Sequence, residues 1–214
     1  MSGLKRNRDR GARRGVRRDS SSGTGFAGLR PAAGERLETG GHPVGFAWSA
    51  NGAWLAVASV DGPVSLIAPT ETGGGRVVWS HDGHPGGASD LAWLDDERFV
   101  TVGWDRRARI WRADDGQPRV EIDLGDAVAE KVAASPINGR FVVAAGKTAS
   151  LFDSQGQLLR RWPARSSTLS AVAFRPQSRH VVLLSYGIVG FFVPVRVDPV
   201  RGLAWAGSLL SLAL

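Results

Sequence analysis

From about residue 43 onward the chain consists of short runs in which apolar and polar residues alternate, separated by polar turns. Five segments share one pattern, in which an alternating apolar run leads through a polar turn into a second run. Alternation with a period of two residues predicts β-strands. No gap between the runs carries the 10 to 15 residues of helical periodicity that a parallel α/β fold needs, so that class is excluded. The segments are VGFAWSANGAWLAVAS, DLAWLDDERFVTVG, EKVAASPINGRFVVAAG, AVAFRPQSRHVVLLS and the shorter SLLSLAL.

These segments recur at a nearly constant spacing. The residues that end their first runs are Trp48, Trp93, Ala134, Phe174 and Leu214, which gives spacings of 45, 41, 40 and 40 residues. The second unit divides into four strands near residues 90–93, 98–102, 107–112 and 119–123. A four-stranded unit this short cannot bury both of its faces alone, so neighbouring units must stack. The sequence predicts an all-β fold of the β-propeller type with four-stranded antiparallel blades. We expect repeats near residues 42–80, 84–123, 126–162 and 166–206, with a fifth begun at 208–214.

Short motifs in these units resemble those of the WD-repeat β-propellers. Gly41-His42 and Gly83-His84 match the Gly-His dipeptide that precedes the first strand in that family. Ile110-Trp111-Arg112 and Leu151-Phe152-Asp153 stand at its Trp-Asp position, at the end of the third strand. The turns SANG, SPIN-G and RPQS resemble its Ser-Pro-Asp-Gly turn. The resemblance spans residues 36–214 and implies the propeller fold more specifically than any function.

The resemblance also implies a structural network of four side chains in the second unit: His84, Thr101, Asp105 and Trp111. In such a network the turn aspartate accepts a hydrogen bond from the histidine ring, and the hydroxyl group links the ring to the indole N–H. Only the second unit has the complete set. The departures are Ile67 at the Trp position of the first unit, Gly146 at the Asp position of the third, and Tyr186 and Phe192 at the Asp and Trp positions of the fourth.

The number of units leads to two alternatives. Members of the resembled family usually close with seven blades, which at about 40 residues each need about 280 residues. Residues 35–214 provide about 180, so we expect a partial propeller in a truncated chain. A closed ring of four blades is the competing arrangement. In a truncated chain an unpaired apolar sheet face would favour self-association.

The charge of the chain is concentrated in one segment. The 214 residues carry 27 Lys and Arg against 20 Asp and Glu, a net charge of +7. Residues 1–34 hold nine of the basic and two of the acidic side chains, so residues 35–214 are neutral. This first segment is also rich in Gly and Ser and has no apolar periodicity, which predicts a disordered basic arm. No apolar core of a signal peptide and no run of about 20 apolar residues is present, so we expect a cytoplasmic protein.

The basic arm allows three interpretations. Eight cationic side chains among the first 18 residues would release counterions on binding RNA or DNA, giving nonspecific contact through phosphates. No aromatic residue precedes Phe26, so the arm has no platform on which bases could stack. A solvated extension and a start codon assigned too far upstream are the alternatives. The candidate contacts are Lys5, Arg6, Arg8, Arg10, Arg13, Arg14, Arg17 and Arg18.

The sequence offers little that indicates catalysis. The absence of cysteine excludes a disulfide framework, a zinc-thiolate site and a thiol nucleophile. The segment His81-Asp82-Gly83-His84 has side chains that could meet one metal ion, but the place of His84 in the structural network is the favoured interpretation. The four histidines form no constellation with a nucleophile. We therefore expect a noncatalytic protein without cofactor or metal.

The tryptophans suggest where a partner binds. Trp104 lies in the turn before Asp105, and Arg106 and Arg107 follow it. The resemblance places this turn on the face most used for partners, and aromatic and Arg side chains are the most frequent interface hot spots. The alternative is a Trp folded over its own blade. These features favour a noncatalytic scaffold for protein–protein interaction, and the arm makes a nucleic-acid-associated protein the second hypothesis. We expect core positions for Trp48, Trp54, Trp79, Trp93 and Trp111.

Overall fold

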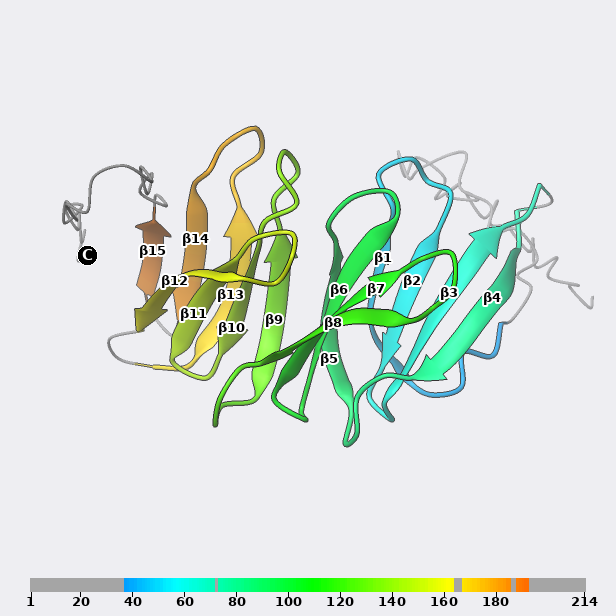
Figure 1. Cartoon of the computed structure of the whole chain (residues 1–214), viewed down its shortest axis with the longest axis horizontal. Coiled ribbons are helices and arrows are strands. Elements are labelled where there is room, and N and C mark those ends of the chain that lie inside the picture. Colours follow the sequence, from blue (N-terminus) through cyan, green and yellow to red (C-terminus); the bar gives the residue numbers. More distant parts are fainter. Residues whose placement is uncertain (1–36, 72, 164–166, 186–187, 193–214) are drawn as a thin grey trace, which may run out of the picture. The chain divides into compact units, whose positions relative to one another are not determined.

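The computed structural model of the chain describes residues 37–71, 73–163, 167–185 and 188–192. The basic arm, the start of the fifth unit and Tyr186 lie outside these residues. The described part is all-β, and no helix in it is long and apolar enough to cross a membrane. Its strands form antiparallel sheets in chain order, one for each of the first four repeats (Figure 1). The predicted all-β fold with propeller blades of the WD-repeat type is thus confirmed.

Three of the sheets have four described strands and the last has three. The first sheet contains β1 (Pro43–Trp48), β2 (Leu55–Ser59), β3 (Pro63–Pro69) and β4 (Gly75–Asp82). The second contains β5 (Ala88–Trp93), β6 (Arg98–Gly103), β7 (Arg107–Arg112) and β8 (Pro118–Asp123). The third contains β9 (Ala129–Ala134), β10 (Phe141–Ala145), β11 (Thr148–Phe152) and β12 (Leu158–Pro163). The fourth contains β13 (Leu169–Phe174), β14 (Val181–Ser185) and β15 (Ile188–Phe192).

The period-two alternation of each strand places apolar side chains on both faces of its sheet. We call the face toward the preceding sheet in the chain the front face, and the opposite one the back face. In β10, Phe141 and Val143 pack from the front face into a core shared with the second sheet. Val142 and Ala144 pack from the back face into a core shared with the fourth sheet. Two-sided burial of this kind explains why the middle strands have continuous apolar sequences.

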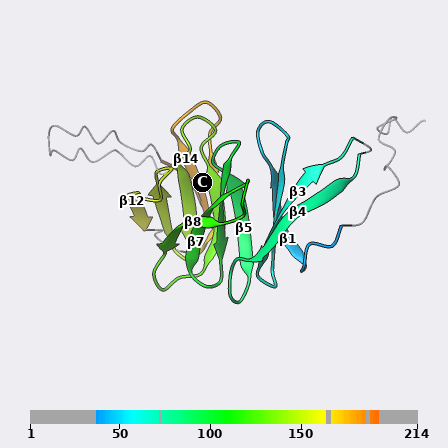
Figure 2. The ribbon, with the colours of Figure 1, turned by 45° about the vertical axis from the view of Figure 1, so that its right-hand side comes forward.

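Each pair of successive sheets encloses one apolar core, and the same strands meet every time. The first strands β1, β5, β9 and β13 are in contact in that order. Between the first two sheets Leu66, Phe99 and Trp111 are buried, and the rings of Phe99 and Trp111 stack with centroids 6.4 Å apart. In the described residues the four sheets form an open series rather than a closed four-bladed ring (Figures 1 and 2).

The turn of the third sheet differs from its predicted form. Two residues, Gly146 and Lys147, join β10 to β11, whereas three residues join β6 to β7. Gly146 adopts the left-handed conformation that this tight turn requires, with φ of 55°. The third sheet therefore has no position equivalent to Asp105, because the turn is shorter by one residue.

Candidate functional site

The structure brings His84, Thr101, Asp105 and Trp111 together on the front face of the second sheet. His84 leads from β4 into β5, Thr101 lies on β6, Asp105 in the β6–β7 turn and Trp111 on β7. The Trp111 indole N–H donates to Thr101 Oγ1 at 2.8 Å. His84 Nε2 lies 2.7 Å from that oxygen, and His84 Nδ1 lies 2.8 Å from Asp105 Oδ1. Asp105 thereby connects the exposed turn to the buried core.

The donors and acceptors of this chain fix the protonation of His84. Thr101 Oγ1 accepts from the indole, so its own hydroxyl donates to His84 Nε2, and the ring proton sits on Nδ1 and is donated to Asp105. Burial lowers the pKa of His84 below its usual value, against the hydrogen bond and charge of Asp105, which raise it. Burial alone would raise the pKa of Asp105, but hydrogen bonds from His84 and Arg109 outweigh it and lower that pKa. The network therefore contains a neutral imidazole and an ionised carboxylate.

Arg109 is a further member of the network that the motif comparison missed. Its guanidinium pairs with Asp105 through one nitrogen and with Glu121 Oε2, at 2.7 Å, through another. Arg109 is a β7 neighbour of both Thr101 and Glu121 in the sheet, and it is nearly buried. The signal for it was the alternation along β7, which places residue 109 on the same face as Trp111.

The first sheet shows what remains when the network is incomplete. His42 Nδ1 lies 2.8 Å from Asp61 Oδ2, but the His42 side chain is exposed. Strand register puts Val57 and Ile67 where the second sheet has Thr101 and Trp111. Apolar side chains thus fill the places of the hydroxyl and the indole, and the His–Asp pair stays at the surface.

The β6–β7 turn is held by backbone bonds as well as by Asp105. The Trp104 N–H donates to Gly87 O at 2.9 Å, and the Arg106 N–H donates to Gly103 O at 3.2 Å. Arg106 adopts a left-handed conformation with φ of 62°, and its carbonyl accepts from the Leu124 N–H at 3.0 Å. A side-chain carbon at Gly103 would overlap the His84 ring, so the turn requires glycine there. The turn is therefore rigid at both of its ends.

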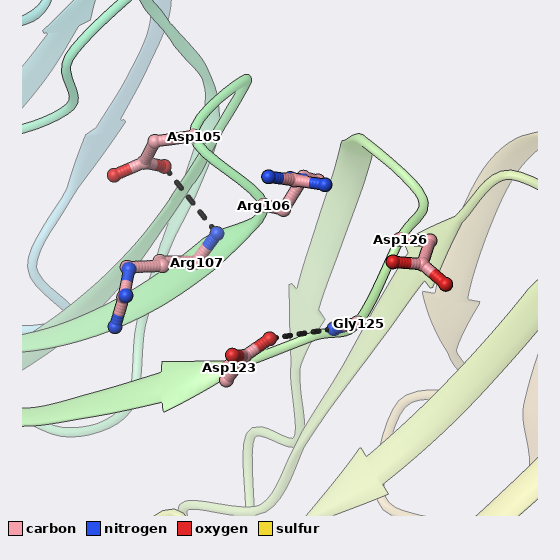
Figure 3. Close-up of a pocket in the computed structure, with 6 residues that line it drawn as sticks. All are labelled: Asp105, Arg106, Arg107, Asp123, Gly125 and Asp126. Atoms are coloured by element: carbon pink, nitrogen blue, oxygen red, sulfur yellow. Dashed lines mark hydrogen bonds between the residues drawn. The ribbon is translucent and has the colours of Figure 1, made fainter.

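The side chains that this turn presents are largely free for a partner. Trp104 is 54% exposed, so its indole extends from the blade instead of folding over it. Arg106 is exposed, and among the described residues no carboxylate pairs with it, whereas Arg107 pairs with Glu121. Both arginines line a shallow polar pocket of about 200 Å³ (Figure 3). Its other lining residues are Asp105, Asp123, Gly125 and Asp126.

A groove at the opposite ends of the strands was missed by the sequence interpretation. It has a volume of about 730 Å³ and is lined by Trp48, Trp93 and Ile137 among others. Trp48 is 51% exposed, so the expected core position is wrong for it. Trp48 is on the front face of the first sheet, where no described sheet packs against it. The backbone N–H of Asn51 donates to Asp96 Oδ1 at 2.9 Å, tying two of the turns that flank the groove.

The histidine pair that suggested a metal site does not converge. His84 is engaged by Thr101 and Asp105, whereas the His81 ring stacks on Trp79 with centroids 5.4 Å apart. Within the described ranges, no group of three or more His, Cys, Asp or Glu side chains is placed to hold a metal ion. The candidate nucleic-acid contacts of the arm lie outside those ranges.

Comparison with known proteins points to one repeat family. The family model described as "WD domain, G-beta repeat" matches residues 75–112. The match begins with β4 of the first sheet and continues through β5, β6 and β7 of the second. It contains the whole of the network and the turn with Trp104. No curated protein sequence matches the chain.

Proposed function

Because the chain is built from WD repeats, we propose that it is a noncatalytic scaffold that binds a protein partner through the β6–β7 turn. WD repeats in general serve protein–protein interaction. The observation that carries the proposal for this chain is the exposed indole of Trp104 on a turn anchored from below. The finer assignment, to Trp104, Arg106 and Arg107, rests on the contacts of that turn.

Rigidity is the first argument for this turn. A side chain that is already ordered loses less conformational entropy on binding, so a rigid aromatic contributes more net affinity than a mobile one. Trp104 and Arg106 are fixed at the backbone by bonds to Gly87 and Gly103. The buried network fixes Asp105 between them. The energy that orders the turn is therefore supplied by folding and not by the partner.

Chemistry is the second argument. An exposed Trp offers a large apolar surface together with an N–H donor, and Arg offers planar, charge-assisted hydrogen bonds to carboxylates. We expect a protein segment that places an apolar side chain on Trp104 and a carboxylate at Arg106. Arg107 already pairs with Glu121, so its contribution is smaller.

The test is capture of partners by matched variants of the full chain. Wild type, Trp104→Ala and Trp48→Ala are immobilised, and proteins retained from native lysate are identified by mass spectrometry. Trp48 is the control because it is also a half-exposed Trp, but at the other end of the blades. We expect partners that are retained by wild type and Trp48→Ala and lost with Trp104→Ala. Retention that is unchanged by Trp104→Ala, or no retained partner at all, contradicts the proposal.

A further inference from the structure

The two ends of the sheet series carry apolar faces that no described sheet covers. On the front face of the first sheet, Val44 and Phe46 of β1 are exposed, Phe46 by 72%. On the back face of the fourth sheet, Leu184, Val189 and Phe191 are exposed, Phe191 by 74%. Large apolar side chains gathered on one face are characteristic of surfaces that become buried in an interface.

Register shows that these are the faces that sheets use inside the chain. Gly45, next to Phe46, faces the second sheet, where it approaches the backbone of Asp90. Val181 and Leu183 of β14 pack toward the third sheet, so Leu184 points away from it. Leu184 pairs with Val189, and Val182 pairs with Phe191, which makes one continuous apolar surface on the back of β14 and β15.

The three interfaces within the chain all follow one rule: the back face of one sheet packs on the front face of the next. The two end faces are the unused halves of such an interface. We propose that the back face of the fourth sheet packs against the front face of the first sheet of a second copy of this chain. This contact would continue the series with the same kind of surfaces.

A second copy is the occupant that supplies the required front face. The contact is heterologous, because the two surfaces are different, so the same two faces recur with each copy added. The exposed side chains at its centre, Val44, Phe46, Leu184, Val189 and Phe191, carry no charge that burial would penalise. The competing occupant is residues 193–214 of the same chain, which would leave the protein monomeric.

Complementation of two variants tests the contact. Phe46→Glu damages only the front face, and Phe191→Glu damages only the back face; both positions are exposed, so we expect folding to be retained and circular dichroism to verify it. Leu158→Glu is the control, since Leu158 is a half-exposed apolar residue on the outer strand β12. Light scattering after size-exclusion chromatography gives the mass of each full-length chain.

We expect wild type and Leu158→Glu to associate to at least two copies of the 22.7 kDa chain, about 45 kDa, and each Phe variant alone to be monomeric. An equimolar mixture of the two Phe variants retains one intact pair of faces and is expected to give a 1:1 complex. A monomeric wild type overturns the proposal. So do a single Phe variant that still associates, a mixture that remains monomeric, and a Leu158→Glu chain that dissociates. The outcome is independent of the proposed function, because Trp104 is not on these faces.

Discussion

At the scale of single residues, the buried network is a chain of polar groups that satisfy one another inside an apolar core. Thr101 is the central group, because its oxygen accepts from Trp111 and its proton goes to His84. Removing a hydroxyl of this kind leaves two buried polar groups without a partner, which costs more than a single hydrogen bond is worth. The front face of the first sheet shows that apolar residues can occupy both positions.

This comparison gives a double-mutant prediction. We expect Thr101→Val to lower the free energy of unfolding by about 1–3 kcal/mol, because the indole N–H and His84 Nε2 lose their partner. Trp111→Ile is expected to cost about 3 kcal/mol through lost packing. The pair reproduces Val57 and Ile67 of the first sheet, so the double variant should cost less than the sum by about 1 kcal/mol. Urea unfolding measures all three; strict additivity would contradict coupling through Thr101.

The neutral state of His84 predicts how stability depends on pH. The pKa of His84 is lowered in the folded protein by burial. As the pH falls below 6.5, the unfolded chain takes up a proton at His84 and the folded chain does not, so stability is lost with falling pH. His84→Gln is expected to be less stable at neutral pH but to lose less stability between pH 6.5 and about pH 5 than wild type. Equal pH slopes in urea unfolding of the two proteins would contradict this assignment.

At the scale of strands and sheets, the link between the first two blades depends on β4. Trp79 of β4 donates its indole N–H to Ala113 O at 2.8 Å, and its ring stacks on Trp111 with centroids 6.1 Å apart. The residues matched by the repeat model also run from β4 into the second sheet. The outer strand of one blade therefore contributes to the core of the next.

We expect Trp79→Phe to destabilise the protein by about 1–2 kcal/mol, because the ring remains but the bond to Ala113 is lost. Trp48→Phe is the matched control, since Trp48 is half exposed, and its cost should lie within about 0.5 kcal/mol of zero. Thermal or urea unfolding of the two variants makes the comparison. Equal effects would show that the contact of β4 with the second sheet adds nothing to stability.

Sequence patterns indicated more about strands than about the environment of individual side chains. The alternation and the spacing of about 40 residues located the four units, because period-two patterns and turns are local properties. Burial depends on whether a neighbouring sheet exists, so Trp48 was assigned to a core although its face is uncovered. Arg109 was missed because motif comparison does not include it, and Gly146 was misassigned because one residue is deleted from its turn.

At the scale of the whole molecule, the described part joins a repeated scaffold to two kinds of exposed surface. The β6–β7 turn presents Trp104 at one end of the blades, and the outward faces of the first and fourth sheets lie at the ends of the series. The net charge of +7 belongs to residues 1–34, so nucleic-acid contact stays a hypothesis about that arm alone. Partner binding and self-association thus involve different residues and can be tested separately.

The central claim is that the rigid turn with Trp104 binds the partner. Calorimetric titration of the most abundant protein captured by wild type, using wild type, Trp104→Ala and Thr101→Val, tests it most directly. We predict a Kd about 30-fold higher for Trp104→Ala, as for an interface hot spot. A smaller increase is predicted for Thr101→Val, which keeps every exposed side chain but loosens the support of Asp105. An unchanged Kd for Trp104→Ala would contradict the claim.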